Sequence, residues 1–253
     1  MAVPIEQILA LVFRFAMAFV YLYLFLYFYK SYKKSKEQGL TNNYFYGFSI
    51  LFAILVVFHV LYGSYEYYIN ILQGPVDLKQ QFPWFDENTN DVGSLSHQIR
   101  PAYLIFYFLM NMVIATQVYP LEQALGWKKT PASKIIILCG CSLWLLFIPA
   151  LSYSLAAWVI VIAGFLGIAI GFMLNIGANL KLFRNSVGAL RKRALYAVFA
   201  FLLLALGLIW SMEVGWGELI YQGIGNREDV VIGCLIQIVA VVFYKLGFMK
   251  KEE

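Results

Sequence analysis

Residues 156–180 read AAWVIVIAGFLGIAIGFMLNIGANL, 25 consecutive residues without a single Asp, Glu, Lys or Arg. The hydrocarbon core of a bilayer is ~30 Å thick and is crossed by about 20 apolar residues in a helix. Inside that core a chain segment must satisfy its own backbone hydrogen bonds, which a helix does. This stretch therefore predicts a transmembrane helix and sets the class of protein to which the chain belongs.

Six further windows have the same character. Hydrophobic residues make up 62% of the 253-residue chain, and the mean hydropathy is +0.72, well above the ~45–50% apolar content of soluble domains. The predicted spans are residues 4–29, 44–68, 101–119, 134–151, 156–180, 195–216 and 230–246. We therefore predict an all-α, multi-pass protein of the cell membrane, with residues 1–253 forming one seven-helix domain. The first span has no basic segment before it and no small-residue cleavage site, so we expect it to be retained as a helix.

The basic residues predict the orientation of these spans. Fifteen of the 19 Lys and Arg residues fall in alternate connections or at the C-terminal end, within residues 30–36, 128–134, 181–193 and 245–251. Cytoplasmic loops carry such an excess of positive charge. The N-terminus is therefore expected outside and the C-terminus in the cytoplasm. The net charge of +5 then reflects topology and contact with the lipid bilayer, and no nucleic-acid partner is expected.

One predicted connection, residues 70–100 on the outer side, is much longer than the others. Long loops of this kind are commonly functional or disordered. The first three ligand positions of a calcium loop are matched by Asp86, Asn88 and Asn90. Asp91 then stands where the loop needs glycine, and His97 stands where it needs a bidentate glutamate. The cluster matches a calcium loop only in part. We therefore expect a solvated turn and no metal, with calcium binding as the weaker alternative.

Motifs for catalysis are not found in the sequence. There is no H-E-x-x-H, no G-x-S-x-G and no aspartate inside a predicted span. His59 is the single histidine within a span, which argues against a bis-histidine haem. Cys139 and Cys141 are two residues apart, so on a helix they point about 200° away from each other and do not chelate one ion. We expect a protein that is not an enzyme and carries no cofactor.

Arg14 lies in the middle of an otherwise apolar run, ALVFRFAMAF. An arginine at this depth costs ~2.5–3.5 kcal/mol on insertion scales, so such residues face the interior of a bundle and are paired. Counting along each helix predicts a polar layer at or above this level, made of Arg14, His59, Glu66, Asn111, Glu213 and Gln237. We expect Glu66 or Glu213 as the counter-ion. The layer is either a sealed structural lock or a binding or proton-linked site.

Small and aromatic residues add two packing predictions. Gly164, Gly167 and Gly171 form a stripe for close approach of another helix, either in this chain or in a second copy. Tyrosines crowd the inner end of the first span and the outer end of the second, a distribution typical of aromatic belts at the headgroup level.

The layout of the first three spans resembles a known group of proteins. A first span ending in a lysine-rich loop is followed by GLTNNYFYGFSILFAI (residues 39–54), and the third span leaves through YPLEQALGWKKT (residues 119–130). This layout is similar to uncharacterised prokaryotic seven-helix membrane proteins and to the seven-helix sensor modules of some histidine kinases. Rhodopsins and G-protein-coupled receptors are excluded, because the only lysine of the last span, Lys245, lies at its cytoplasmic edge and the DRY and NPxxY motifs are absent.

The resemblance implies a receptor-like or partner-binding module that senses an extracytoplasmic ligand or partner. Because the sequence ends at KLGFMKKEE, its output is expected to pass through a separate membrane or cytoplasmic protein. Two alternatives stay open: a small-solute or ion transporter that uses the polar layer, and an accessory subunit of a larger membrane complex.

Overall fold

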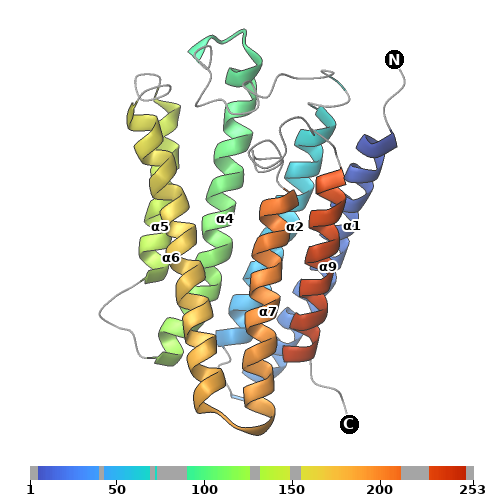
Figure 1. Cartoon of the computed structure of the whole chain (residues 1–253), viewed down its shortest axis with the longest axis vertical. Coiled ribbons are helices and arrows are strands. Elements are labelled where there is room, and N and C mark those ends of the chain that lie inside the picture. Colours follow the sequence, from blue (N-terminus) through green and yellow to red (C-terminus); the bar gives the residue numbers. More distant parts are fainter. Residues whose placement is uncertain are drawn as a thin grey trace. The chain divides into compact units, whose positions relative to one another are not determined.

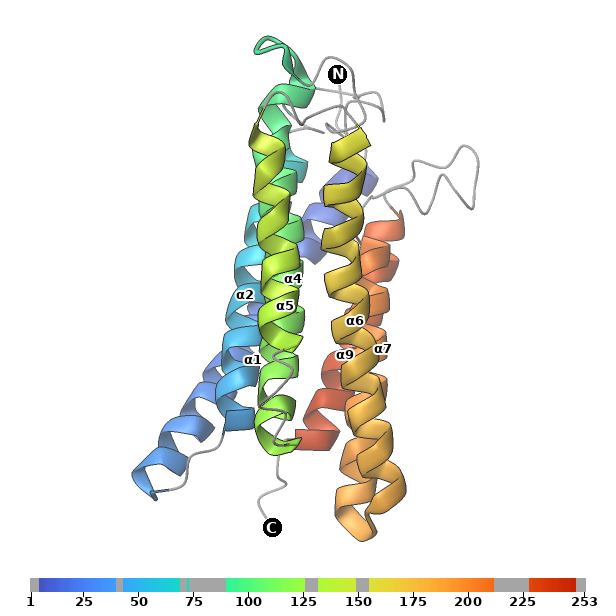
Figure 2. The same cartoon turned by 90° about the vertical axis from the view of Figure 1, so that its left-hand side faces the viewer.

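A computed structural model describes residues 5–39, 43–68, 72, 90–125, 132–148, 155–211 and 228–248. Every element in these ranges is a helix (Figure 1 and Figure 2). They are α1 (Ile5–Glu37), α2 (Asn43–Tyr67), α4 (Leu95–Leu125), α5 (Ala132–Ser142), the short 3-10 helix η3 (Leu143–Phe147), α6 (Leu155–Asn185), α7 (Gly188–Ser211) and α9 (Glu228–Phe248). The predicted all-α architecture is confirmed for the described residues.

Six of these helices are long and apolar enough to cross a bilayer: α1, α2, α4, α6, α7 and α9. The seventh predicted span, residues 134–151, corresponds to the shorter apolar helix Ala132–Phe147, in which α5 gives way to η3. The helical character of a multi-pass membrane protein is therefore confirmed, while the seventh segment is shorter than expected.

The helices are divided between two compact units. The smaller unit contains residues 1–17 and 173–253, and the larger unit contains residues 18–172. Helices α1 and α6 each contribute one part to each unit. The contacts below are described within each unit separately.

In the larger unit, α2 and α4 form an antiparallel pair held by interlocking aromatic rings. Tyr62 of α2 lies 4.6 Å from Phe106 of α4, measured between ring centroids, and Tyr65 lies 5.4 Å from Tyr103. Tyr62 and Tyr65 are only 0% and 9% exposed. The prediction that these tyrosines belong to an aromatic belt is therefore wrong, because their side chains form the helix interface.

Helix α1 packs its aromatic residues onto α2 in the same unit. Tyr21 and Phe28 are both fully buried and both stack on Phe52 of α2. Tyr23 and Tyr29 lie on the other side of the helix, where Tyr23 is 58% exposed and Tyr29 is 50% exposed. The tyrosine-rich run thus divides between a buried face and an outward face, and only the outward face matches the belt prediction.

Helix α5 is anchored to the end of α4 by a carboxylate. Glu122 of α4 is buried and accepts hydrogen bonds from the Ser133 backbone nitrogen at 2.8 Å and from Ser133 Oγ at 2.5 Å. Ser133 lies in the first turn of α5, where backbone N–H groups have no partner within the helix and the helix dipole favours negative charge. Glu122 therefore acts as a capping residue supplied by the neighbouring helix.

Replacing Glu122 with alanine is expected to lower the free energy of unfolding by about 1–2 kcal/mol, the range seen when a helix cap is removed. Thermal unfolding of the detergent-solubilised protein measures the effect. Glu37→Ala at the exposed end of α1 is the matched control and should have little effect. Equal stability of the two variants would contradict the capping role.

Helix α4 begins earlier than the sequence indicated. Ser94 Oγ accepts a hydrogen bond from the backbone nitrogen of His97 at 3.1 Å, which is the geometry of an N-cap. The helix then starts at Leu95. Residues 95–100, predicted as the end of the long outer loop, are therefore the first turns of α4. Hydropathy alone marked the apolar part of this helix and missed its polar beginning.

Candidate functional site

Arg14 is completely buried in the smaller unit. Its side chain is 0% exposed, and its Nη2 donates a hydrogen bond to the backbone carbonyl of Ser211. Ser211 is the last residue of α7 that the structure describes. Hydrogen bonds with a charged donor are roughly twice as strong as those between neutral groups. A guanidinium group is well suited to this position, because it brings positive charge and several N–H donors.

Gln237 of α9 connects to the same serine. Its Nε2 donates to Ser211 Oγ at 3.1 Å and to the Gly207 carbonyl of α7 at 3.1 Å. Both Gln237 and Ser211 are 0% exposed. We name Arg14, Ser211 and Gln237 the Arg14 cluster. It joins α1, α7 and α9 through hydrogen bonds in an apolar environment, where a bond between neutral groups such as those of Gln237 contributes on average about 0.6 kcal/mol.

The cluster depends on close packing between α7 and α9, which lie side by side (Figure 1). A Cβ atom built on Gly207 would lie 2.6 Å from Gln237 Cγ, and one on Gly233 would lie 2.5 Å from the Ser211 backbone nitrogen. Gly207 of α7 thus faces Gln237 of α9. Ser211, four residues later on α7, faces Gly233, which is four residues earlier on α9. The two helices are therefore antiparallel and in register, and glycine lets their backbones meet.

Three further residues of the predicted polar layer belong to the larger unit. His59 is fully buried, and its ring centroid lies 5.3 Å from that of Tyr21. Glu66 is also buried, at 1% exposure. Asn111 Nδ2 donates to the Tyr107 carbonyl at 3.0 Å. The remaining predicted member, Glu213, lies outside the described residues, so its role as counter-ion stays a prediction.

Asn111 is enclosed by glycines of the two helices that follow α4. A Cβ on Gly140 of α5 would lie 2.7 Å from Asn111 Cβ, and one on Gly167 of α6 would lie 2.6 Å from Asn111 Oδ1. Asn111 is 0% exposed. It therefore lies where α4, α5 and α6 approach one another closely.

The glycine stripe of α6 contacts helices of the same chain. A Cβ atom on Gly164 would lie 3.0 Å from Leu143 Cδ2, and one on Gly171 would overlap the Ile114 side chain. These neighbours belong to η3 and α4. The observed contacts are thus those of internal packing.

The calcium-like cluster is described only at its last member. Asn90 Oδ1 accepts a hydrogen bond from Arg100 Nη1 at 3.4 Å, whereas Asp86 and Asn88 lie outside the described residues. Within the described ranges, no group of three or more His, Cys, Asp or Glu side chains is placed to hold a metal ion.

Sequence reasoning missed Ser211 and Glu122. Ser211 receives Arg14 through its backbone carbonyl, a group that every residue has, so its role leaves no mark in the sequence. A weak signal did exist in the spacing of Gly207 and Ser211, because small residues four apart favour close helix packing. Glu122 is one of few carboxylates near the end of a span, and that rarity was the available signal.

Together these features define a class: a multi-pass helical membrane protein whose buried polar residues connect helices to one another. Comparison of the chain with protein-family models, with curated proteins and with solved structures finds no match.

Proposed function

We propose that the chain is a non-catalytic, receptor-like membrane module that binds an extracytoplasmic ligand or partner and passes the change to a separate protein. The observation that carries this proposal is the hydrogen bond from the buried Arg14 guanidinium to the Ser211 carbonyl of α7. A guanidinium group bound in this way connects α1 to α7, and at least one of its N–H donors is already used. That arrangement favours a coupling role over a site for a passing solute.

The proposed topology has seven crossings, with the N-terminus outside. Helix α5 has 11 residues and η3 has 5, which together extend about 26 Å at the rise of each helix type. This length approaches the ~30 Å hydrocarbon core and supports a crossing by the shorter helix. The lysine-rich and arginine-rich connections then all face the cytoplasm, as the positive-inside rule favours.

In this topology Ser211 lies toward the outer side of α7. A ligand or partner bound on the outer side would act on the part of α7 that contains Ser211. The Arg14 cluster joins Ser211 to α1 and α9, so a shift of its carbonyl would move both helices. Their other ends carry basic residues, among them Lys36 and Lys245, which suit contact with an acidic surface of a cytoplasmic partner.

The test compares the wild-type chain with Arg14→Met, using quantitative affinity purification from the source cells and solute flux in proteoliposomes. The module predicts a near-stoichiometric partner that is reduced several-fold in Arg14→Met, with no solute flux. Arg100→Met is the control, because Arg100 is also buried but lies outside the cluster, and it should retain the partner.

The same experiment distinguishes the alternatives. Solute flux that disappears in Arg14→Met, without a recovered partner, would indicate that the protein is a transporter and not a receptor-like module. A partner that binds equally to the wild-type chain and to Arg14→Met would indicate an accessory subunit in which the cluster only stabilises the fold.

A further inference from the structure

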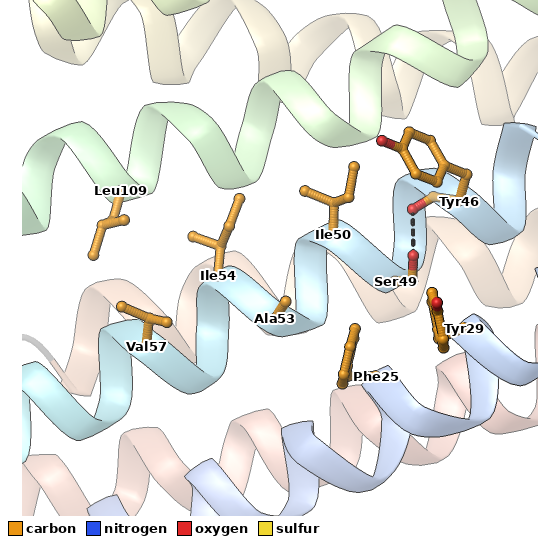
Figure 3. A pocket seen from close by; sticks show the side chains of 9 residues that line it. All are labelled: Phe25, Tyr29, Tyr46, Ser49, Ile50, Ala53, Ile54, Val57 and Leu109. Atoms are coloured by element: carbon orange, nitrogen blue, oxygen red, sulfur yellow. Dashed lines mark hydrogen bonds between the residues drawn. The ribbon is translucent and has the colours of Figure 1, made fainter.

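An apolar groove lies on the larger unit between α1, α2 and α4. Its volume is about 310 Å³, near the lower end of the range for small-molecule sites. Figure 3 shows Phe25 of α1, Ala53 and Val57 of α2 and Leu109 of α4 around it. Val57 is 47% exposed. The groove is therefore open along one side, within helices long enough to cross a membrane.

The length of the groove corresponds to one leaflet. Its lining on α2 runs from Tyr46 to Val57, which spans about 16 Å at the helical rise of 1.5 Å per residue. Half of the hydrocarbon core is ~15 Å. One acyl chain of a phospholipid extends over this depth.

The two ends of the groove differ in polarity. Ile54, Val57 and Leu109 line one end, whereas Tyr29, Tyr46 and Ser49 line the other (Figure 3). The Ser49 hydroxyl donates to the Tyr46 carbonyl at 2.7 Å. The tyrosine rings are about half exposed, as is common where a lipid headgroup meets the hydrocarbon.

Positive charge continues from this polar end. Phe25 and Tyr29 stack at 5.8 Å and are four residues apart on α1. Lys33 is four residues further along, so it extends the same stripe of the helix. The exposed lysines of the last turns of α1 are Lys30, Lys33, Lys34 and Lys36. An anionic headgroup at this end of the groove would therefore meet complementary charge.

We infer that the groove binds one acyl chain of an anionic phospholipid, with the chain beside Phe25 and Ala53 and the headgroup at Lys33. This lipid site is independent of the proposed function. It requires the lysine-rich end of α1 and the polar end of the groove to coincide, and both belong to the larger unit.

The test uses the full chain in phosphatidylcholine vesicles that contain a trace of phosphatidylglycerol with a photoreactive acyl chain. After irradiation, mass spectrometry measures labelled peptides from α1 and α2, and photoreactive phosphatidylcholine serves as the comparison. We expect phosphatidylglycerol to label the groove several-fold more strongly. Lys33→Gln should reduce this preference about fivefold, the contribution of one basic residue near an anionic leaflet. Lys34→Gln, on a different face of the same turn, should reduce it less.

A second variant tests the cavity itself. Ala53→Phe fills the groove and should reduce labelling of α1 and α2, while Val60→Phe places the same ring at an exposed position of α2 beyond the groove and should not. Equal labelling by the two lipids would overturn the inference, as would labelling that Ala53→Phe leaves unchanged. Cross-linking of a second copy of the chain at the groove in place of lipid would also overturn it.

Discussion

Gly233→Ala is expected to destabilise the protein, although alanine is the best helix former and glycine is among the worst. The new Cβ atom would lie 2.5 Å from the backbone nitrogen of Ser211 and 2.6 Å from its Cβ. A backbone atom that packs directly against a neighbouring helix does not move aside cheaply. Helices α7 and α9 would have to separate, which would also lengthen the hydrogen bonds from Gln237 to Gly207 and Ser211.

The expected change in the free energy of unfolding is the balance of two opposing terms. Overpacking a well-packed interface costs about 1–3 kcal/mol, while replacing glycine by alanine in a helix gains about 0.8–1 kcal/mol. We expect a net loss because the clash involves backbone and adds the weakened hydrogen bonds of the Arg14 cluster. Reversible unfolding in mixed micelles measures the free energy.

Gly177→Ala is the matched control. Gly177 lies within α6, and a Cβ atom at this position would have nothing within 4 Å. The same substitution should therefore stabilise the protein by up to about 1 kcal/mol. The two variants are predicted to change stability in opposite directions. A Gly233→Ala protein as stable as Gly177→Ala would mean that α7 and α9 do not pack in this register.

The sequence was sufficient to predict the helices because hydropathy is a local property. Residues 156–180 carry no charge, and α6 covers them completely. The shortness of α5 was less visible, since the apolar run continues from Leu143 through Phe147 while the backbone changes from α-helix to 3-10 helix. A window of hydropathy does not distinguish these two helix types.

The depth of the polar residues could also be counted along each helix, but the sequence did not identify their hydrogen-bond partners. Helices that are apolar on all sides have no polar face to reveal which side meets a neighbour. Arg14 was expected to face the interior, and it is fully buried. Its observed acceptor is the backbone carbonyl of Ser211, whereas sequence reasoning considered only side chains as partners. Packing between distant segments decides such contacts.

Arg14→Glu is expected to have the largest effect of the substitutions at the cluster. It would place a carboxylate against the Ser211 carbonyl, so that two hydrogen-bond acceptors face each other. An uncompensated buried charge costs about 3–5 kcal/mol. The variant should therefore yield little folded protein, measured as the monodisperse fraction in size-exclusion chromatography and by resistance to proteolysis.

Arg14→Met separates the charge from the shape of the side chain. Methionine gives up a charge-assisted hydrogen bond of about 1.5–3 kcal/mol, but it also removes the ~2.5–3.5 kcal/mol cost of holding arginine in the membrane. The two terms nearly cancel, so Arg14→Met should fold about as well as the wild-type chain. If Arg14→Glu folded equally well, the side chain at position 14 would have to reach water or lipid headgroups, and the Arg14 cluster would not connect α1 to α7 and α9. If both variants failed to fold, arginine itself would be needed for assembly, and the cluster would then be a structural lock and not a coupling element.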